Sequence, residues 1–343
     1  GSDITMNETE SYYQYRVSLR PEDMVVGKNF ITDVVTGEKD KILNKAVKWY
    51  QFKIPISEYE NVIGSIEDFK SIRFMRMFMK GFTDTTILRF ATLELVRGEW
   101  RKYNYSLVEG QEGMPSADLP SSSFAISTVN IEENNKRTPV NYVLPPGVDR
   151  VIDHSQSQVT QLNEQSMEYK VENLADGDAK SAYKTLNVDV RHYKYLKMDI
   201  HAEKIEGYAL DDDEVTAFIR LGSDYSNNYY EYEVPLKLTP YKSNYNNNKE
   251  SDREIVWPRD NLIDINLDNL VDVKLARNSE MKKSGSKVTL TTVYSMADGT
   301  NTMKVVGNPN LSEVKVVMIG IRNPAKSSNS EDDGMAKSVI AWF

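Results

Sequence analysis

Three histidines are the residues of this sequence best suited to metal binding or acid–base chemistry, yet their placement favours neither. His154, His192 and His201 match no zinc-ligand spacing. None has a cysteine or a serine elbow beside it, which a nucleophilic site would need. The chain has no cysteine, and this excludes disulfides, zinc–thiolate sites and thiol nucleophiles. We therefore expect the histidines to be structural.

A run of four carboxylates, Asp211-Asp212-Asp213-Glu214, offers the oxygen ligands that calcium prefers. The run lacks the spacing and the glycine of an EF-hand loop. A solvated acidic turn between two strands is the favoured interpretation, with a calcium site as the alternative.

Four aromatic residues form another candidate site, a platform on which a sugar ring could stack. They are Tyr225, Tyr229, Tyr245 and Trp257, and packing at strand ends is the simpler interpretation. No glycine-rich phosphate loop follows a strand and opens a helix. No two carboxylates can be assigned as acid and base from their spacing. We therefore expect no catalytic, cofactor-binding or metal site and no enzyme activity, and a carbohydrate-binding module stays open as the alternative.

These candidates lie on or beside predicted strands. Val215–Leu238 reads as two strands around a turn. In the second strand Tyr230, Tyr232, Val234, Leu236 and Leu238 share one face, while Glu231, Glu233 and Lys237 share the other. This two-residue period predicts a half-buried antiparallel strand with its charged face outward.

Other segments are also predicted to be strands, chiefly Val188–Ala202, Leu311–Ile321 and Phe69–Phe82. Phe69–Phe82 is apolar on both faces, which is typical of a central strand covered on both sides. Its Met75, Met77 and Met79 favour core packing over a binding groove. A short helix is predicted near Asp268–Arg277 from its helical apolar spacing.

An internal similarity suggests two copies of one module. Tyr12–Leu19 has the pattern of Tyr229–Leu236, with the same apolar positions and a different outer face. The fold class predicted is all-β, with two related antiparallel β-sandwich modules of jelly-roll type and one or two short helices. The expected boundaries are residues 1–108 for a first, incomplete module, 109–147 for an extended linker rich in Gly, Pro and Ser at its start, and 148–343 for the second module.

The composition of the 343 residues narrows the function. Charged residues make up 27% and hydrophobic residues 40% of the chain, as in ordinary globular proteins. A net charge of −9 argues against nucleic acid as a partner. No apolar run reaches the ~18 residues of a membrane-spanning helix, so we expect no direct membrane insertion. The chain opens without a signal-peptide pattern, and we expect it to be a piece of a larger protein.

Long, idiosyncratic runs over almost the whole chain resemble one family, the large SprA/Sov cell-surface proteins of the Bacteroidota. These are packing and turn motifs rather than catalytic ones. The runs are Phe74–Phe78, Leu88–Trp100, Ile219–Asp224, Asn228–Glu233, Val256–Pro258, Gly307–Val314 and Ile319–Asn323.

The resemblance implies a function in the outer membrane. Members of that family form the outer-membrane translocon of the type IX secretion system and are needed for gliding motility. They are very large β-barrels, whereas this chain shows no clear series of lipid-facing strands of ~10 residues. The resemblance therefore implies a soluble, non-catalytic insertion on the extracellular or periplasmic face of the outer membrane. Its expected partners are other segments of the same large protein and secretion-system proteins.

Overall fold

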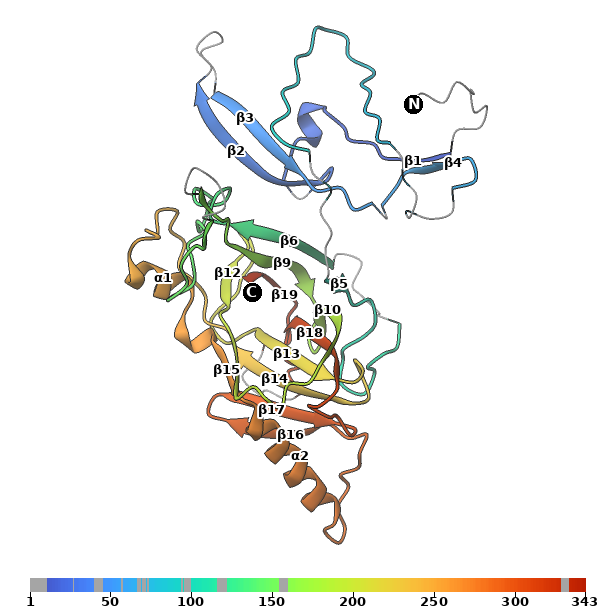
Figure 1. Cartoon of the computed structure of the whole chain (residues 1–343), viewed down its shortest axis with the longest axis vertical. Helices are drawn as coiled ribbons and strands as arrows, with labels where there is room; N and C mark the ends of the chain where they lie inside the picture. The colour runs from blue at the N-terminus through green and yellow to red at the C-terminus, as the bar shows by residue number, and fades with distance from the viewer. Residues whose placement is uncertain are drawn as a thin grey trace. The chain divides into compact units, whose positions relative to one another are not determined.

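The computed structural model describes residues 11–26, 28–39, 46–56, 58–66, 69, 72, 74–93, 95, 100–115, 122–153, 160–327 and 333–343. The chain forms two compact units, residues 1–96 and residues 97–343. Among the described residues antiparallel sheets dominate, and two α-helices accompany them (Figure 1). The all-β class predicted from the sequence is thus confirmed.

In its described residues the first unit contains two separate two-stranded sheets. β1 (Tyr12–Gln14) pairs with β4 (Asn61–Ile63), and β2 (Ile31–Lys39) pairs with β3 (Ala46–Phe52), with a short 3₁₀ turn η1 (Pro21–Asp23) before β2. The described residues of Phe69–Phe82 form no strand, contrary to the prediction. Within the described residues of this unit, the similarity of Tyr12–Leu19 to Tyr229–Leu236 therefore does not extend to a shared sandwich.

The second unit is a sandwich of two antiparallel sheets (Figure 1). The larger sheet has seven strands in the order β16-β17-β14-β13-β18-β10-β5. In chain order they are β5 (Arg101–Lys102), β10 (Ala179–Val188), β13 (Thr216–Gly222), β14 (Tyr229–Pro235), β16 (Tyr294–Asp298), β17 (Asn301–Val306) and β18 (Val314–Arg322).

The smaller sheet has four strands in the order β12-β19-β9-β6. They are β6 (Ser123–Asn130), β9 (Gln165–Leu174), β12 (His201–Lys204) and β19 (Lys337–Trp342). Two further pairs lie outside both sheets: β7 (Ile152–Asp153) with β8 (Thr160–Gln161), and β11 (Tyr195–Met198) with β15 (Ile263–Asn266).

The main core fills the space between the two sheets. Ala217, Ile219 and Leu221 of β13 face Tyr169 and Val171 of β9 in one buried cluster. The Tyr169 hydroxyl crosses the sandwich, donating to the Ile319 carbonyl at 3.1 Å and accepting from the Ala182 amide at 3.1 Å. The alternation predicted for β14 is confirmed, because Tyr230, Tyr232 and Val234 all lie in this core.

The longer helix lies beside the larger sheet, and the shorter one lies among the loops (Figure 1). α2 (Leu267–Met281) buries Leu267, Leu270 and Val273 at helical spacing, and its Asn266 cap accepts from the Asp268 amide. The helix predicted at Asp268–Arg277 is thereby confirmed. The shorter α1 (Glu250–Val256) precedes a 3₁₀ turn, η2 (Arg259–Asn261).

Two sequence-based boundaries differ from the structure. The predicted strand Val188–Ala202 is interrupted: β10 ends at Val188, a turn follows, and β11 and β12 belong to different sheets. The segment expected to be a linker, 109–147, lies within the second unit. Its β6 pairs with β9 from Ser123 to Asn130, and Val140, Tyr142, Val143 and Leu144 are fully or almost fully buried in a second core cluster with Trp257 and Trp342.

Candidate functional site

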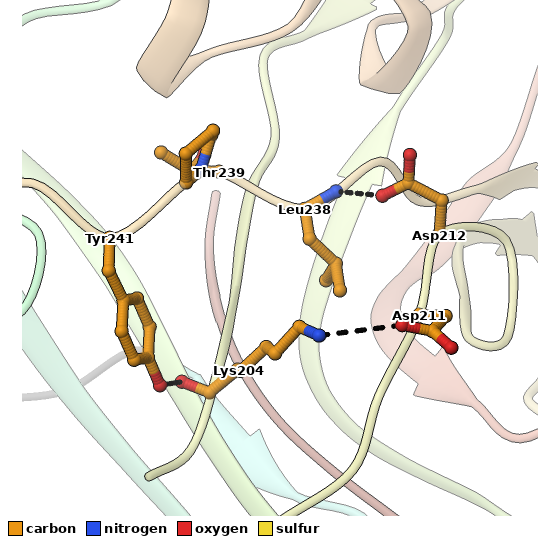
Figure 2. Close-up of a pocket in the computed structure, with 7 residues that line it drawn as sticks. Lys204, Asp211, Asp212, Leu238, Thr239 and Tyr241 are labelled. Carbon is orange, nitrogen blue, oxygen red and sulfur yellow. Dashed lines mark hydrogen bonds and ion pairs between the residues drawn. The ribbon is translucent and has the colours of Figure 1, made fainter.

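The acidic run Asp211–Glu214 borders a hollow of about 530 Å³ at one end of the sandwich, and Figure 2 shows the residues around it. Each of its carboxylates already has a partner. Asp211 faces Lys204, Asp212 accepts from the Leu238 amide at 2.9 Å, Asp213 pairs with Lys237, and Glu214 pairs with Lys337 at 2.7 Å. The Tyr241 hydroxyl donates to the Lys204 carbonyl at 3.0 Å.

These contacts make the run a structural turn whose carboxylates neutralise three lysines. The Glu214 carboxylate also accepts from the Asp211 amide at 2.7 Å, which closes the turn. Within the described ranges, no group of three or more His, Asp or Glu side chains could hold a metal ion.

His201 is buried against the second core cluster, where its ring stacks on Trp342 at 3.8 Å. Its Nδ1 donates to the Val256 carbonyl at 2.8 Å, and its Nε2 lies 3.6 Å from the Glu203 carboxylate. Arg137 pairs with Glu203 at 2.6 Å. Burial alone would raise the pKa of the Glu203 carboxyl, but contact with His201 and the charge of Arg137 lower it. Of the other histidines, His192 is exposed and His154 lies outside the described residues.

The four aromatic residues predicted to form one platform are not together. The hydroxyl of the buried Tyr229 donates to Glu112 at 2.9 Å, and its ring lies 3.6 Å from the Arg220 guanidinium. Tyr245 and Trp257 belong to the second core cluster, where the Trp257 indole donates to the Val143 carbonyl at 2.9 Å. Tyr225 borders a surface hollow, apart from the other three. The platform composed of all four is therefore wrong.

Sequence reasoning missed a buried charge network on the face of the larger sheet that points away from the core. Glu231 and Glu233, predicted to face outward into water, are at most 7% exposed. Three cations surround them: Arg220 lies 2.5 Å and Arg322 3.0 Å from Glu231, and Lys304 contacts both carboxylates. Glu112 completes the network 3.0 Å from Arg220.

The network balances three positive charges with three negative ones. Burial by itself would raise the pKa of the Glu231 carboxyl, but the charges of Arg220, Arg322 and Lys304 hold it well below its ordinary value. Burial would also raise the pKa of the Glu233 carboxyl, but the charges of Arg322 and Lys304 lower it. The segment that carries Glu112 covers the network, and its Tyr103 and Leu107 pack against Phe218 and Met318. Arg220 pairs with Glu112 and Arg322 donates to the Leu107 carbonyl at 3.2 Å, so the arginines of the network hold the covering segment in place.

Next to this covering segment lies a second hollow of about 280 Å³, which we term the tyrosine hollow. Tyr183 and Tyr225 have ring centroids 4.6 Å apart, and Tyr103 lies 6.2 Å and 5.6 Å from them. These rings come from three distant parts of the chain, so no local pattern could have brought them together. The residues lining the hollow are Lys102, Tyr103, Asn104, Tyr105, Gly113, Tyr183, Tyr225 and Ser226.

Comparison with known proteins identifies one family. The family model SprA_N, described as motility related/secretion protein, matches residues 2–342. No curated protein matches the chain. No helix in the described part of the chain is both long and apolar enough to cross a membrane.

Proposed function

Because the chain belongs to the SprA_N family of motility related/secretion proteins, we propose that it is a non-catalytic interaction domain of a large cell-surface protein of the outer membrane. In this role it serves type IX protein secretion and gliding motility. Its partners are other segments of the same large protein and components of the secretion system.

A run of exposed apolar side chains in the first unit carries this proposal. Fully burying one such side chain stabilises a protein by about 1.5–3 kcal/mol, and exposed apolar patches mark interaction sites. Ten large apolar residues are at least 52% exposed: Ile72, Phe74, Met75, Met77, Phe78, Met79, Ile87, Phe90, Leu93 and Leu95.

This run overlaps two of the motifs that resemble the SprA/Sov proteins, Phe74–Phe78 and Leu88–Trp100. The prediction that its methionines pack in a core is wrong for the described residues, because Met75, Met77 and Met79 are more than half exposed. An apolar segment of this kind is stabilised when another protein surface covers it. Other segments of the same outer-membrane protein are the occupants we propose.

The arrangement of the second unit supports a structural rather than a catalytic role. Its three most deeply buried carboxylates in the described residues, Glu203, Glu231 and Glu233, are each paired with arginine or lysine. A catalytic carboxylate faces a cleft, and its pKa is shifted to a value that suits proton transfer. Here the pKa values of Glu231 and Glu233 are lowered, which keeps both groups ionised and paired.

Site-specific crosslinking tests the proposal. A photo-crosslinking amino acid replaces Phe78 in the full-length protein of a bacterium that uses type IX secretion. The expected product joins this position to another segment of the same polypeptide or to a secretion-system component. The matched control places the crosslinker at Tyr193, which is 63% exposed in the second unit.

A functional measurement accompanies the crosslinks. The triple change Phe74→Ser, Phe78→Ser and Phe90→Ser removes apolar surface from the exposed run without altering a described core residue. Gliding and release of a type IX cargo should both fall. Wild-type gliding and cargo release, together with crosslinking at Phe78 no different from that at Tyr193, would contradict the proposal.

A further inference from the structure

We propose that the tyrosine hollow binds one ring of a neutral saccharide. This inference is independent of the secretion role, because the hollow lies in the second unit and the exposed apolar run lies in the first. The volume of about 280 Å³ is just below the ~300–1,000 Å³ typical of drug-sized small-molecule sites. That size suits a single ring.

The aromatic side chains supply stacking faces. Tyr103 is buried beneath the hollow, Tyr183 and Tyr225 are half-buried in its walls, and Tyr105 is 55% exposed at its rim. The Tyr105 ring lies 5.6 Å from that of Tyr103. The face of an aromatic ring carries partial negative charge, and the C–H bonds on one face of a sugar ring carry partial positive charge. A sugar therefore stacks well in such a place.

Polar groups in the hollow are free to bind hydroxyls. The side chains of Asn104, Tyr103 and Tyr183 make no hydrogen bond to any described residue. Burial raises the pKa of the Tyr103 hydroxyl, so it stays protonated and can donate. The hollow beside Asp211 differs, because its carboxylates and its Tyr241 hydroxyl already have partners (Figure 2). Of these two hollows, the tyrosine hollow is the one that combines unused polar groups with aromatic faces.

The charges around the hollow favour a neutral ligand. The Lys102 ammonium donates to the Phe124 carbonyl at 2.7 Å, and Glu112 is engaged by Arg220 and Tyr229. An anionic ligand would need a cation that is not already in use. A proline-rich peptide would need a groove lined with aromatic residues that is long enough for several residues, whereas this hollow holds about 280 Å³.

The hollow is also held in shape before any ligand binds. The Tyr103 amide donates to the Ser181 carbonyl at 2.9 Å, and Arg220 donates to the Tyr225 carbonyl. The Gly113 amide donates to the Ser106 carbonyl at 3.0 Å, which closes the loop opposite Ser226. A preformed site loses less conformational entropy on binding.

Ligand-detected saturation-transfer NMR on the full chain tests the inference, with maltotriose, cellotriose and triacetylchitotriose as probes. We expect saturation transfer to at least one of them. Asn104→Ala, an exposed change that leaves the rings in place, should weaken its binding about three- to tenfold. Tyr183→Ala, which removes a stacking face, should weaken it about tenfold or more. Tyr183→Phe keeps the ring, so it should weaken saccharide binding less than Tyr183→Ala does.

Tyr193→Ala serves as the control, since this exposed tyrosine lies outside the hollow. It should bind as the wild type does. The inference is overturned if none of the three saccharides binds, or if Asn104→Ala and Tyr183→Ala both bind like the wild type. Binding of a proline-rich peptide that is lost in Tyr183→Ala, with no saccharide binding, would assign the hollow to peptides instead.

Discussion

Arg220 lies in the middle of the buried charge network and contacts two carboxylates, Glu231 and Glu112. Its side chain is 1% exposed. Removing one partner of a buried ion pair leaves an uncompensated charge, which costs more than the pair itself contributes. A single substitution in the network should therefore lower the stability of the second unit. The network lies on the face of β14 that the sequence predicts to be solvated.

We expect Arg220→Met to lower the free energy of unfolding by about 3 kcal/mol. Urea denaturation followed by tryptophan fluorescence measures this, because Trp257 and Trp342 are buried in the same unit. Arg191→Met is the control: Arg191 is 62% exposed and pairs only with Asp189 among the described residues, so its loss should cost less than about 1 kcal/mol. Equal effects of the two changes would count against a structural network.

The lowered pKa values of Glu231 and Glu233 predict acid sensitivity. Their folded-state pKa values lie below the unfolded value of about 4.3. The stability they contribute is thus fully present above that value and is lost as the pH falls through the folded-state values. The urea midpoint should decrease as the pH is lowered below about 4.

A variant separates this contribution from the general effect of acid. In Glu231→Gln one titrating group is absent, so the midpoint should be lower at neutral pH and should change less on acidification. A wild-type midpoint that stays constant or rises in acid would refute the assignment.

At the scale of elements, β18 is an interior strand of the larger sheet, with β13 on one side and β10 on the other. Gly320 lies opposite Phe218 of β13, whose ring covers it. A Cβ at Gly320 would lie 2.4 Å from the Phe218 Cζ and 2.8 Å from the Lys180 carbonyl oxygen. The glycine thus lets the ring lie flat on the strand and support the covering segment.

Gly320→Ala should destabilise the chain by about 2–3 kcal/mol, because the ring or the strand must move. Gly299→Ala is a matched control in the turn between β16 and β17. Gly299 has φ +64° and open space around its Cα, so only the backbone cost of about 1 kcal/mol applies. Thermal unfolding of both variants measures the difference, and a Gly320 variant no less stable than the Gly299 variant would contradict the close contact.

At the scale of the molecule, the second unit begins near Arg97 rather than at the proline-glycine boundary near residue 148. β6 and the buried residues Val140, Tyr142, Val143 and Leu144 lie before that boundary. At about 1.5–3 kcal/mol for each buried side chain, these four residues alone contribute about 6–12 kcal/mol. This is close to the whole stability of an ordinary domain, about 5–15 kcal/mol.

Residues 97–343 should therefore fold when expressed alone, with a cooperative thermal transition and near-ultraviolet circular dichroism. Residues 148–343 should lack both, because they lose a strand of the smaller sheet and the segment covering the charge network. Cooperative unfolding of 148–343 with the stability of 97–343 would show that the preceding segment is a linker after all.

Local periodicity and long motifs were enough to predict part of this structure and its family. Alternation fixed which side chains of β14 face the core, helical spacing located α2, and the extended runs pointed to the family that the chain belongs to. These signals depend on neighbours within a few residues, and the same physics acts on them in any tertiary context.

What covers each face of the sheets could be seen only in the folded chain. Alternation assigns Glu231 and Tyr230 to opposite faces of the strand. It does not predict that Glu112, more than a hundred positions earlier, lies over the charged face. The tyrosine hollow likewise joins residues 103, 183 and 225. Conversely, the apolar run at Phe74–Phe78 predicts that its side chains are buried, but it does not indicate which surface covers them. Burial depends on contacts between distant segments, and a local pattern contains no information about them.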